Sequence, residues 1–287
     1  MSVVLNDSRD LDSIVRSIDQ IATLPDITVQ IIQAVEDPRN NAYQLLRIVS
    51  HDPALAARIL KVVNSSFYGL RVEITSLERA IALLGMNAIK NLAVASTVSS
   101  MFRSGPICHG LEATDLWDHS VAVAVCAREL ARGMALESSD EAFLVGLLHD
   151  VGLLLEHQLY GAQLRAICEE ARASRRHFRD LEHERLGFNH AELGGAVAQR
   201  WKFPTGIAAA IRHHHDPAAA PAEHQSLARL VHVADTLCCQ SIGGFNLTGL
   251  RQQIEDPTIE MIPLSWDVLN ATRDNLAQLI DMASPFR

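Results

Sequence analysis

The sequence predicts an all-α protein with two helical lobes. Apolar residues recur at three- and four-residue spacing along nearly every segment, as they do on one face of a helix. No alternating apolar and polar run of useful length indicates a strand. The helical pattern is interrupted at residues 103–106 by the turn-forming sequence Arg-Ser-Gly-Pro. We therefore place an N-terminal helical lobe at 1–105, a second helical lobe at 106–240 and a C-terminal helical extension at 241–287.

The first three helices of the N-terminal lobe are predicted from their start and stop signals. Asp26 is expected to cap a helix that ends near Asp37, and the apolar spacing over 43–49 indicates a second helix. The dipeptide Asp52-Pro53 combines an N-cap with a first-turn proline, which opens a third helix.

Two more helices complete the predicted lobe. Thr75 and Glu78 have capping-box spacing at the start of one helix, and Gly85 is suited to end it. The other helix is expected over residues 87–101.

The second lobe and the extension are also predicted to be helical. Helices are expected at 116–134, around His149-Asp150, at 165–176, from about 190 onwards, at 227–237 and, as an amphipathic tail, at 265–282. Residues 217–221 form an Ala/Pro loop.

Composition limits the class of protein. The chain has 287 residues, 48% of them hydrophobic, which is enough for a sizeable core. The net charge of −9 argues against a broad nucleic-acid-binding face. Five cysteines without C-x-x-C spacing indicate reduced thiols and a cytoplasmic location. We see no signal peptide and no uninterrupted apolar run of membrane-spanning length.

The dipeptide His149-Asp150 is the strongest functional signal. It stands in the apolar run AFLVGLLHDVGLLLEH, which we expect to be one helix buried on all sides. Burying an ionised aspartate there costs on the order of several kcal/mol unless a cation or a set of donors compensates it. The neighbouring histidine makes a metal ion a natural compensator.

Five other residues could complete a metal site: His119, His190, His214, His215 and Asp235. Imidazole and carboxylate ligands suit Mn, Fe or Zn, and two such metals could activate a water and hold a phosphate for hydrolysis. Each residue also has a structural explanation. A helical histidine can be a hydrogen-bonded core residue, the triplet at 213–215 can be a solvated helix cap, and Asp235 can pair locally. Spacing alone leaves these alternatives open.

The order of these residues resembles the HD superfamily of metal-dependent phosphohydrolases, and the sequence from about 21 to 237 is similar to its HDOD family, the HD-related output domains. The segments that carry the similarity are LPDITVQIIQAV, HDPALAARILKVVNSSFYG, ITSLERAIALLGMNAIKNLA, WDHSVAVA, LLHDVG, NHAELGG, RWKFP, IRHHHDP and VHVADTL.

This resemblance implies an HD-like second lobe and a bacterial signal-transduction protein that acts through contacts with other signalling proteins. It implies a metal set with one or two divalent ions (Fe, Mn or Zn), in which Asp150 bridges two metals in a catalytic relative. The residues that match this set are His119, His149, Asp150, His190, His214, His215 and Asp235. The triplet leaves the register of the paired histidines open by one residue. A nucleotide is a candidate ligand, whereas nucleic acid and membrane partners are not expected.

Two departures from the cyclic-di-GMP phosphodiesterases of the HD-GYP type matter for activity. Leu153 stands where those enzymes have a lysine that contacts phosphate, and their Gly-Tyr-Pro signature is absent after the histidine triplet. Loss of the cation removes a charge-assisted bond to phosphate. The sequence therefore favours a signalling protein over the alternative, a metal-dependent phosphohydrolase acting on a nucleotide or cyclic nucleotide. A nucleotide sensor without turnover is a third hypothesis.

Two further groups of residues have a structural interpretation. Phe67 and Tyr68 are expected to pack across the lobe interface. The arginines of the segment 172–179 are expected to form a solvated helix face rather than to bind phosphate. They are Arg172, Arg175, Arg176 and Arg179.

Overall fold

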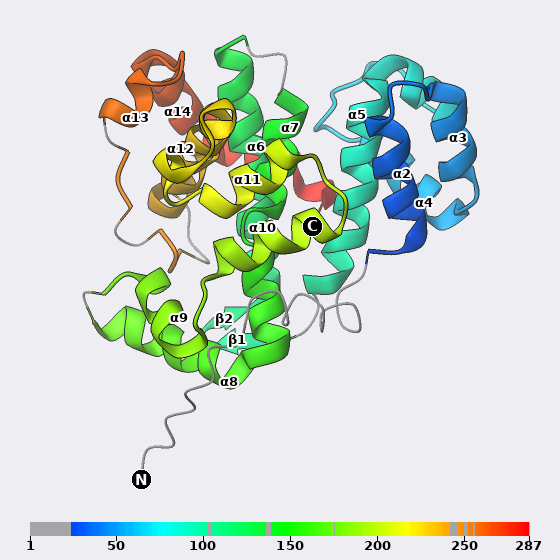
Figure 1. Ribbon diagram of the computed structural model, residues 1–287. Helices are drawn as coiled ribbons and strands as arrows, with labels where there is room; N and C mark the ends of the chain where they lie inside the picture. The colour runs from blue at the N-terminus through cyan, green and yellow to red at the C-terminus, as the bar shows by residue number, and fades with distance from the viewer. Residues whose placement is uncertain are drawn as a thin grey trace.

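The computed structural model describes residues 24–102, 105–135, 139–174, 176–241, 246–249, 252–254 and 256–286. This part of the chain is almost entirely helical, which confirms the predicted fold class. Figure 1 shows the N-terminal helices as a group at the side of a larger helical body. One small strand pair was not predicted, the antiparallel β1 (Pro106–Cys108) and β2 (Leu111–Glu112). Of the predicted features, residues 1–23, 103, 104 and Arg175 lie outside the described residues.

The N-terminal lobe is built around one long helix. The elements are α2 (Asp26–Glu36), α3 (Ala42–Ser50), α4 (Pro53–Val63) and α5 (Leu77–Val98). The first three all pack against α5, which therefore forms the centre of the lobe. Their apolar faces are fully buried at residues such as Ile31, Leu45 and Ile59, so burial of these faces holds the lobe together.

The helix caps of this lobe agree with the sequence in part. Asp52 caps α4 as predicted, because its side chain accepts a hydrogen bond from Leu55 N at 2.9 Å. The predicted caps at Asp26 and Thr75 are wrong by one residue. Asp26 already lies in the first turn of α2, where its charge favours the helix N-terminus. Ser76 caps α5, because its backbone is extended there and its hydroxyl accepts from Arg79 N.

Gly85 marks a sharp kink in α5. Its φ of 83° lies in the left-handed region that favours glycine, so the helix breaks there as predicted and resumes directly. The second segment ends at Val98 and continues as the 3₁₀ turn η1 (Ser99–Phe102).

The remaining elements form the second lobe and the extension. In chain order they are α6 (Ala113–Gly133), α7 (Ser139–Leu148), α8 (Val151–Ala173), α9 (Phe178–Leu186), α10 (His190–Arg200), α11 (Thr205–His213), η2 (Pro217–Ala219), η3 (Ala222–His224), α12 (Gln225–Ser241), α13 (Asp256–Glu260), α14 (Trp266–Met282) and η4 (Ser284–Phe286). The predicted separate helix at 165–176 is the second half of α8, which bends at Tyr160. Helix α9 was not predicted; its sequence has a weak apolar periodicity.

The His-Asp dipeptide does not lie inside one helix, as we had expected from the continuous apolar run. Helix α7 ends at Leu148 and α8 begins at Val151, so His149 and Asp150 form the junction between them. Both helices are buried, which explains why the sequence pattern runs through the junction. The bend turns both side chains towards the same interior space.

Close approaches of helices at glycine positions define this interior. A Cβ atom at Gly152 would lie 1.9 Å from the carbonyl oxygen of His190, and one at Gly146 would lie 2.7 Å from Ala124 Cα. The two glycines therefore let α8 contact the start of α10 and let α7 contact α6. These contacts bring the helices that carry the histidines close to Asp150.

The C-terminal end of the chain closes the space between the lobes. Phe286 packs against both Phe67 of the N-terminal lobe and Phe143 of α7, with ring centroids 5.0 and 5.5 Å away. Its carbonyl accepts a hydrogen bond from the Trp117 indole. Phe67 also contacts Phe143 directly, which confirms the predicted packing across the interface. The guanidinium of Arg128 lies over the Phe67 ring.

Two helical stretches, Leu77–Phe102 and Ser139–Ala173, have the length and mean hydropathy of membrane spans. In the structure, 56% and 83% of their most apolar windows are buried against the rest of the protein. Packing within the core accounts for this apolar composition.

Candidate metal centre

The structure brings all seven predicted site residues together in the interior of the second lobe. His119 comes from α6, His149 and Asp150 from the α7–α8 junction, and Asp235 from α12. His190 is the first residue of α10, and His214 and His215 directly follow α11. His119 and His215 are each 7% exposed, and the other five are fully buried. Residues separated by more than a hundred positions thus form one cluster.

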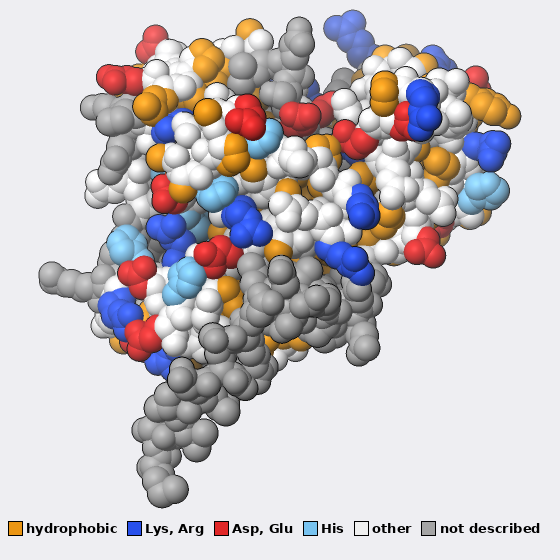
Figure 2. Space-filling view, in the orientation of Figure 1, with side chains coloured by type: hydrophobic (Ala, Val, Ile, Leu, Met, Phe, Trp, Pro, Cys, Tyr) orange, Lys and Arg blue, Asp and Glu red, His pale blue; other side chains and the backbone are white. Residues whose placement is uncertain are grey.

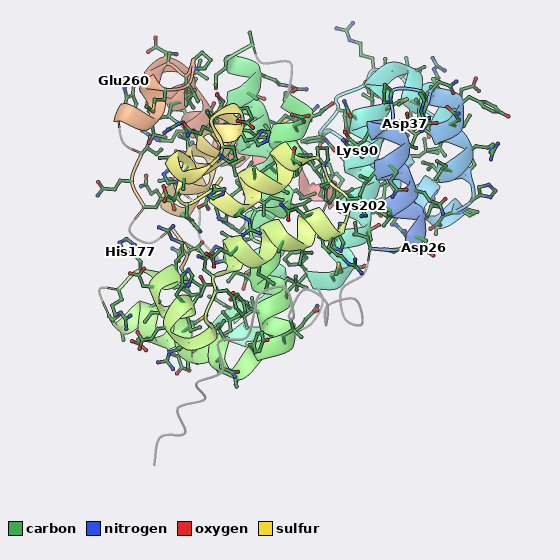
Figure 3. The ribbon with its side chains drawn as sticks, viewed as in Figure 1. Asp26, Asp37, Lys90, His177, Lys202 and Glu260 are labelled. Atoms are coloured by element: carbon green, nitrogen blue, oxygen red, sulfur yellow. The ribbon has the colours of Figure 1, made fainter. Side chains whose placement is uncertain are left out.

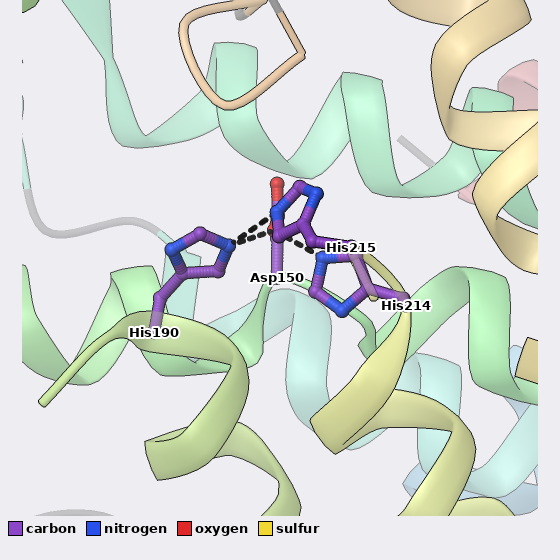
Figure 4. A group of neighbouring side chains, drawn as sticks. All are labelled: Asp150, His190, His214 and His215. Carbon is purple, nitrogen blue, oxygen red and sulfur yellow. Dashed lines mark hydrogen bonds and ion pairs between the residues drawn. The ribbon is translucent and has the colours of Figure 1, made fainter. Parts of the chain in front are cut away.

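One half of the cluster surrounds Asp150 Oδ1. His190 Nε2 lies 3.3 Å from this oxygen and His214 Nε2 lies 3.6 Å from it. His215 Nε2 lies 2.9 Å from His190 Nε2. Figure 4 shows Asp150 between His190 on one side and the two adjacent histidines on the other. One ligand atom from each of these four residues lies within 4.8 Å of the others, as a bound ion requires.

The other half surrounds Asp150 Oδ2 and Asp235. His149 Nε2 lies 3.3 Å from Asp150 Oδ2 and 3.7 Å from Asp235 Oδ1, and His119 Nε2 lies 3.0 Å from Asp235 Oδ1. His119, His149 and Asp150 form a second group with metal-ligand spacing. Asp150 therefore belongs to both groups and offers one oxygen to each.

Several of these atoms are buried without a hydrogen bond. They are both oxygens of Asp150, His149 Nε2 and His214 Nε2. The histidine nitrogens lie within ion-pair distance of the carboxylate, but not in hydrogen-bond geometry. Buried polar atoms normally have partners, and a divalent cation in each of the two groups would satisfy these atoms. The residues therefore fit a metal centre.

The second ring nitrogen of each of four histidines is held by the protein. His149 Nδ1 and His214 Nδ1 lie 2.7 Å from the carbonyl oxygens of Gly146 and Ile211. A carbonyl can only accept, so Nδ1 carries the proton and Nε2 points towards the centre. This arrangement fixes the tautomer that can bind a metal.

The contacts of His190 and His215 follow the same rule. His190 Nδ1 donates to Glu182 at 2.8 Å, and His215 Nδ1 donates to Gln252 Oε1 at 2.7 Å. Their Nε2 atoms then face each other at 2.9 Å as two lone pairs. Burial lowers the pKa of both rings, so neither is expected to carry the extra proton that would join them. A cation between the two nitrogens removes this conflict.

The charges of the cluster are strongly coupled. Burial favours neutral Asp150 and Asp235, but the nearby histidines outweigh it and hold the pKa of both carboxyls well below the usual range. Burial also favours neutral His149, but these two carboxylates raise its pKa to about 10. Without a metal, His149 therefore holds a proton at the position that a cation would take.

Three residues around the cluster were not predicted from the sequence, in addition to Gln252, which is described below. Glu182 orients His190, and Glu156 lies beside Glu182 with no hydrogen bond to either of its own oxygens. Cys239 donates its thiol hydrogen to Asp235 Oδ1 at 3.4 Å, and burial raises the pKa of that thiol. A signal existed for Glu156, which is a charged residue at the end of the buried apolar run.

Gln252 joins the two halves of the cluster. Its Oε1 accepts from His215, while its Nε2 donates to Thr236 Oγ1 at 2.6 Å and to Asp235 Oδ2 at 3.3 Å. These acceptors fix the orientation of the amide. No sequence signal marks this glutamine, because its position in a segment without helical periodicity depends on the tertiary fold.

Of the four arginines that we expect on a solvated face, the three that the structure describes have different surroundings. Arg176 pairs with Glu170 and Glu184, and Arg172 donates to His109 O. Arg179 is half-buried and lines a cavity of about 460 Å³ beside His215.

A comparison with protein families shows to which family the chain belongs. The family model of the HDOD domain matches residues 21–217. The chain belongs to the HDOD family. The match ends before Asp235 and Gln252, so two residues of the cluster come from the part of the chain that follows the matched domain.

Solved structures with the same fold support this assignment. An HDOD domain protein of unknown function from Geobacter sulfurreducens has a TM-score of 0.79 at 22% identity, over 96% of this chain and 98% of that chain. A candidate phosphohydrolase from Shewanella amazonensis SB2B has a TM-score of 0.72 at 24% identity, over the same shares. These similarities establish the fold alone.

A relative with a longer chain was also found. An uncharacterized protein of Treponema pallidum (strain Nichols) is 29% identical over 231 residues, which are 78% of this chain and 43% of that protein. The chain thus spans less than half the length of this relative.

Proposed function

We propose that this HDOD protein binds divalent metal at the His/Asp cluster and hydrolyses a phosphoester there. The observation that carries the proposal is the sharing of Asp150 between two ligand groups, with unpartnered buried atoms in both. His190, His214 and His215 would hold one ion, and His119, His149 and Asp235 the other. Nitrogen and carboxylate ligands favour Fe, Mn or Zn over Mg or Ca.

The chemistry of such a centre is general. Metal ions lower the pKa of water and offset the charge that develops on a phosphoryl group. The protein's own residues would supply the rest. Asp150 holds the two ligand groups in register, and Glu182 and Gln252 orient His190 and His215. Burial of five ligands excludes bulk water from the cluster, and the cavity beside His215 gives access to it.

The first test is metal content by elemental mass spectrometry, on the purified full chain and on Asp150→Ala. We expect near-stoichiometric Fe, Mn or Zn in the wild type and loss of the metal in the variant. His51→Ala is the matched control, because His51 is exposed in the N-terminal lobe. Absence of metal in the wild type even after reloading contradicts the proposal.

The second test is hydrolysis. Metal-loaded protein is assayed against a panel of phosphomonoesters, phosphodiesters and cyclic nucleotides, and Asp150→Ala is expected to lose at least about 100-fold in rate, as for removal of a metal ligand. Stabilisation by a nucleotide without product would instead support a sensor.

A second candidate function is signalling through protein contacts, and it is compatible with the first. An apolar groove of about 450 Å³ lies on the N-terminal lobe between residues 70–74 and α5, and Arg71 and Arg79 also line it. Val72 and Leu83 in this groove are 59% and 54% exposed, which favours a partner with apolar and acidic side chains. Photo-crosslinking from position 72 in a bacterial cytoplasm, followed by reconstitution with the purified partner, tests this role. Leu83→Glu should abolish that binding.

A further inference from the structure

The cavity beside the candidate metal centre is lined by two arginines, Arg179 and Arg229, that form no ion pair among the described residues. Its volume of about 460 Å³ falls in the range of small-ligand sites. Its wall includes His215 of the cluster and Gln252, which bonds to that histidine. Figure 3 places His177, which also lines the cavity, at the side of α9 that faces α12 and α13.

Arg229 is a buried cation in this wall. It is 7% exposed and lies on α12, three residues before His232, so these two side chains lie on the same helix face, and both line the cavity. Its guanidinium donates to the neutral amide of Gln225 at 3.2 Å. Within the described part of the chain it forms no ion pair.

The other buried cations of the described residues have different surroundings. Lys90 pairs with Glu36 at 2.5 Å. Arg128 has one unpartnered nitrogen, Nε, but its guanidinium lies over the ring of Phe67, 4.6 Å from the centroid, whereas Arg229 has neither a carboxylate partner nor a ring contact among the described residues. A buried charge without a counter-ion is costly. Arg229 therefore has the environment of a residue that receives its anion from a ligand.

Arg179 lines the same cavity from α9. It is half-buried and has no hydrogen bond or ion pair within the described residues. His215 of the cluster lies in the wall of the same cavity, so Arg179 places a positive charge beside the candidate metal centre. Figure 2 shows basic and histidine side chains between α9 and α12, with acidic side chains among them.

We propose that this cavity binds an organic phosphate, with Arg229 and Arg179 as ligands of the phosphate group. The proposal rests on the proposed function, because it places the phosphate beside His215 of the metal cluster. Arginine forms paired hydrogen bonds with phosphate oxygens, and two guanidinium groups from different helices suit a dianion. The exposed carboxylate of Asp216 lies at the rim, where it can accept from a hydroxyl of the organic part.

The inference also accounts for a departure of the sequence from related phosphodiesterases. Leu153, at the position of their phosphate-contacting lysine, is 1% exposed and contributes no charge. Arg229 and Arg179 supply positive charge from α12 and α9 instead, so the cavity retains a cationic phosphate site without that lysine.

Binding of 5′-AMP to the chelator-treated full chain, measured by titration calorimetry, tests the pocket without a metal contribution. We expect binding of AMP and weaker binding of inorganic phosphate, with no binding of adenosine and only weak binding of succinate. Arg229→Gln and Arg179→Gln should each weaken AMP binding by about tenfold or more, as expected for a lost charge-assisted bond. Arg229→Lys should retain part of it.

Arg165→Gln is the matched control, because Arg165 is exposed on α8 and does not line the cavity. Unfolding temperatures of all variants show whether a loss of binding comes from misfolding, and if Arg229→Gln does not fold, Arg179→Gln and Arg229→Lys decide. Equal affinity of AMP for the wild type and the arginine variants, or equal affinity for AMP and adenosine, overturns the proposal. Metal uptake and hydrolysis are measured separately, so failure of the metal centre leaves this result unaffected.

Discussion

The two lobes differ in whether their buried polar side chains have hydrogen-bond or ion-pair partners. In the N-terminal lobe the buried polar groups are paired within the protein: Thr28 with Thr97, Lys90 with Glu36 and the Asn91 amide nitrogen with Asp140 O. Among the described residues of that lobe, Asn91 Oδ1 is the one buried side-chain atom without a hydrogen bond. The second lobe buries a whole cluster of ionisable groups whose central atoms have no partner.

We expect the buried polar groups of the first lobe to contribute mainly to stability and those of the second lobe mainly to ligand binding. Paired polar groups contribute to a unique packing, whereas unpaired ones lower the stability of the fold unless a ligand compensates them. The buried polar groups of the first lobe therefore depend little on a ligand, whereas the unpartnered atoms of the second lobe are where the proposed cation would contribute to stability. Mutations in the two lobes should separate these properties.

The largest effect on stability is expected from Ile31→Ala in the N-terminal lobe. Ile31 is fully buried in α2 against α5. Removing its side chain leaves a cavity and should cost about 2–5 kcal/mol of unfolding free energy. Denaturant unfolding measures this cost, and elemental mass spectrometry should show an unchanged metal content. Loss of metal from a variant that is still folded would contradict the expectation that packing in the first lobe and metal binding in the second are independent.

A more selective effect is expected at Gln252. Gln252→Leu removes the acceptor of His215 Nδ1 and a donor to Asp235. Residues that hydrogen-bond to a metal ligand typically contribute about 10–100-fold to metal affinity. We therefore expect a loss in that range, measured in competition with a chromophoric chelator. The control is Gln253→Leu, because that neighbouring side chain is exposed. Equal affinities in both variants would show that the amide does not position the ligands.

Much of the fold could be predicted from the sequence because local signals determine it. Some features depend on the chemistry of single residues, which the sequence shows directly. They are the Asp52 cap, the break at Gly85 and the contact of Phe67 across the interface. The errors are also local. Thr75 is misplaced because the neighbouring Ser76 hydroxyl can accept the same backbone N–H groups, and Asp26 is misplaced because α2 begins one residue earlier than expected, directly after Pro25.

The sequence could predict which residues form the cluster, but not which residues surround it. The seven residues were identified from their order and a family resemblance, and the structure brings them together. Glu182, Gln252 and Arg229 depend on which helices lie beside the cluster, and periodicity does not encode this. The burial of His149-Asp150 was recognised, but its place at a helix junction was not, because buried helices on both sides give one continuous apolar run.

The smallest expected effect concerns the carboxyl pair behind His190. Glu156 and Glu182 are both fully buried, and neither oxygen of Glu156 has a hydrogen bond. Burial and then the charge of Glu182 raise the pKa of Glu156 well above its usual value of 4.5. A carboxyl with a raised pKa in the folded state stabilises the protein fully below the unfolded pKa. That contribution is lost as the pH rises through the folded pKa.

Glu156→Gln keeps the shape of the protonated side chain and cannot ionise. Its amide can donate to Glu182, so the metal-free variant should be more stable than the wild type at pH 8, by about 1–3 kcal/mol, the usual cost of an unsatisfied buried group. The difference should shrink towards pH 5, near the unfolded pKa, and unfolding temperatures across this range measure it. Glu169→Gln, an exposed change on the same helix, should leave the difference near zero at every pH. A variant that is less stable than the wild type at pH 8 would mean that the Glu156 carboxylate has a partner, and that this part of the second lobe is as well satisfied as the first.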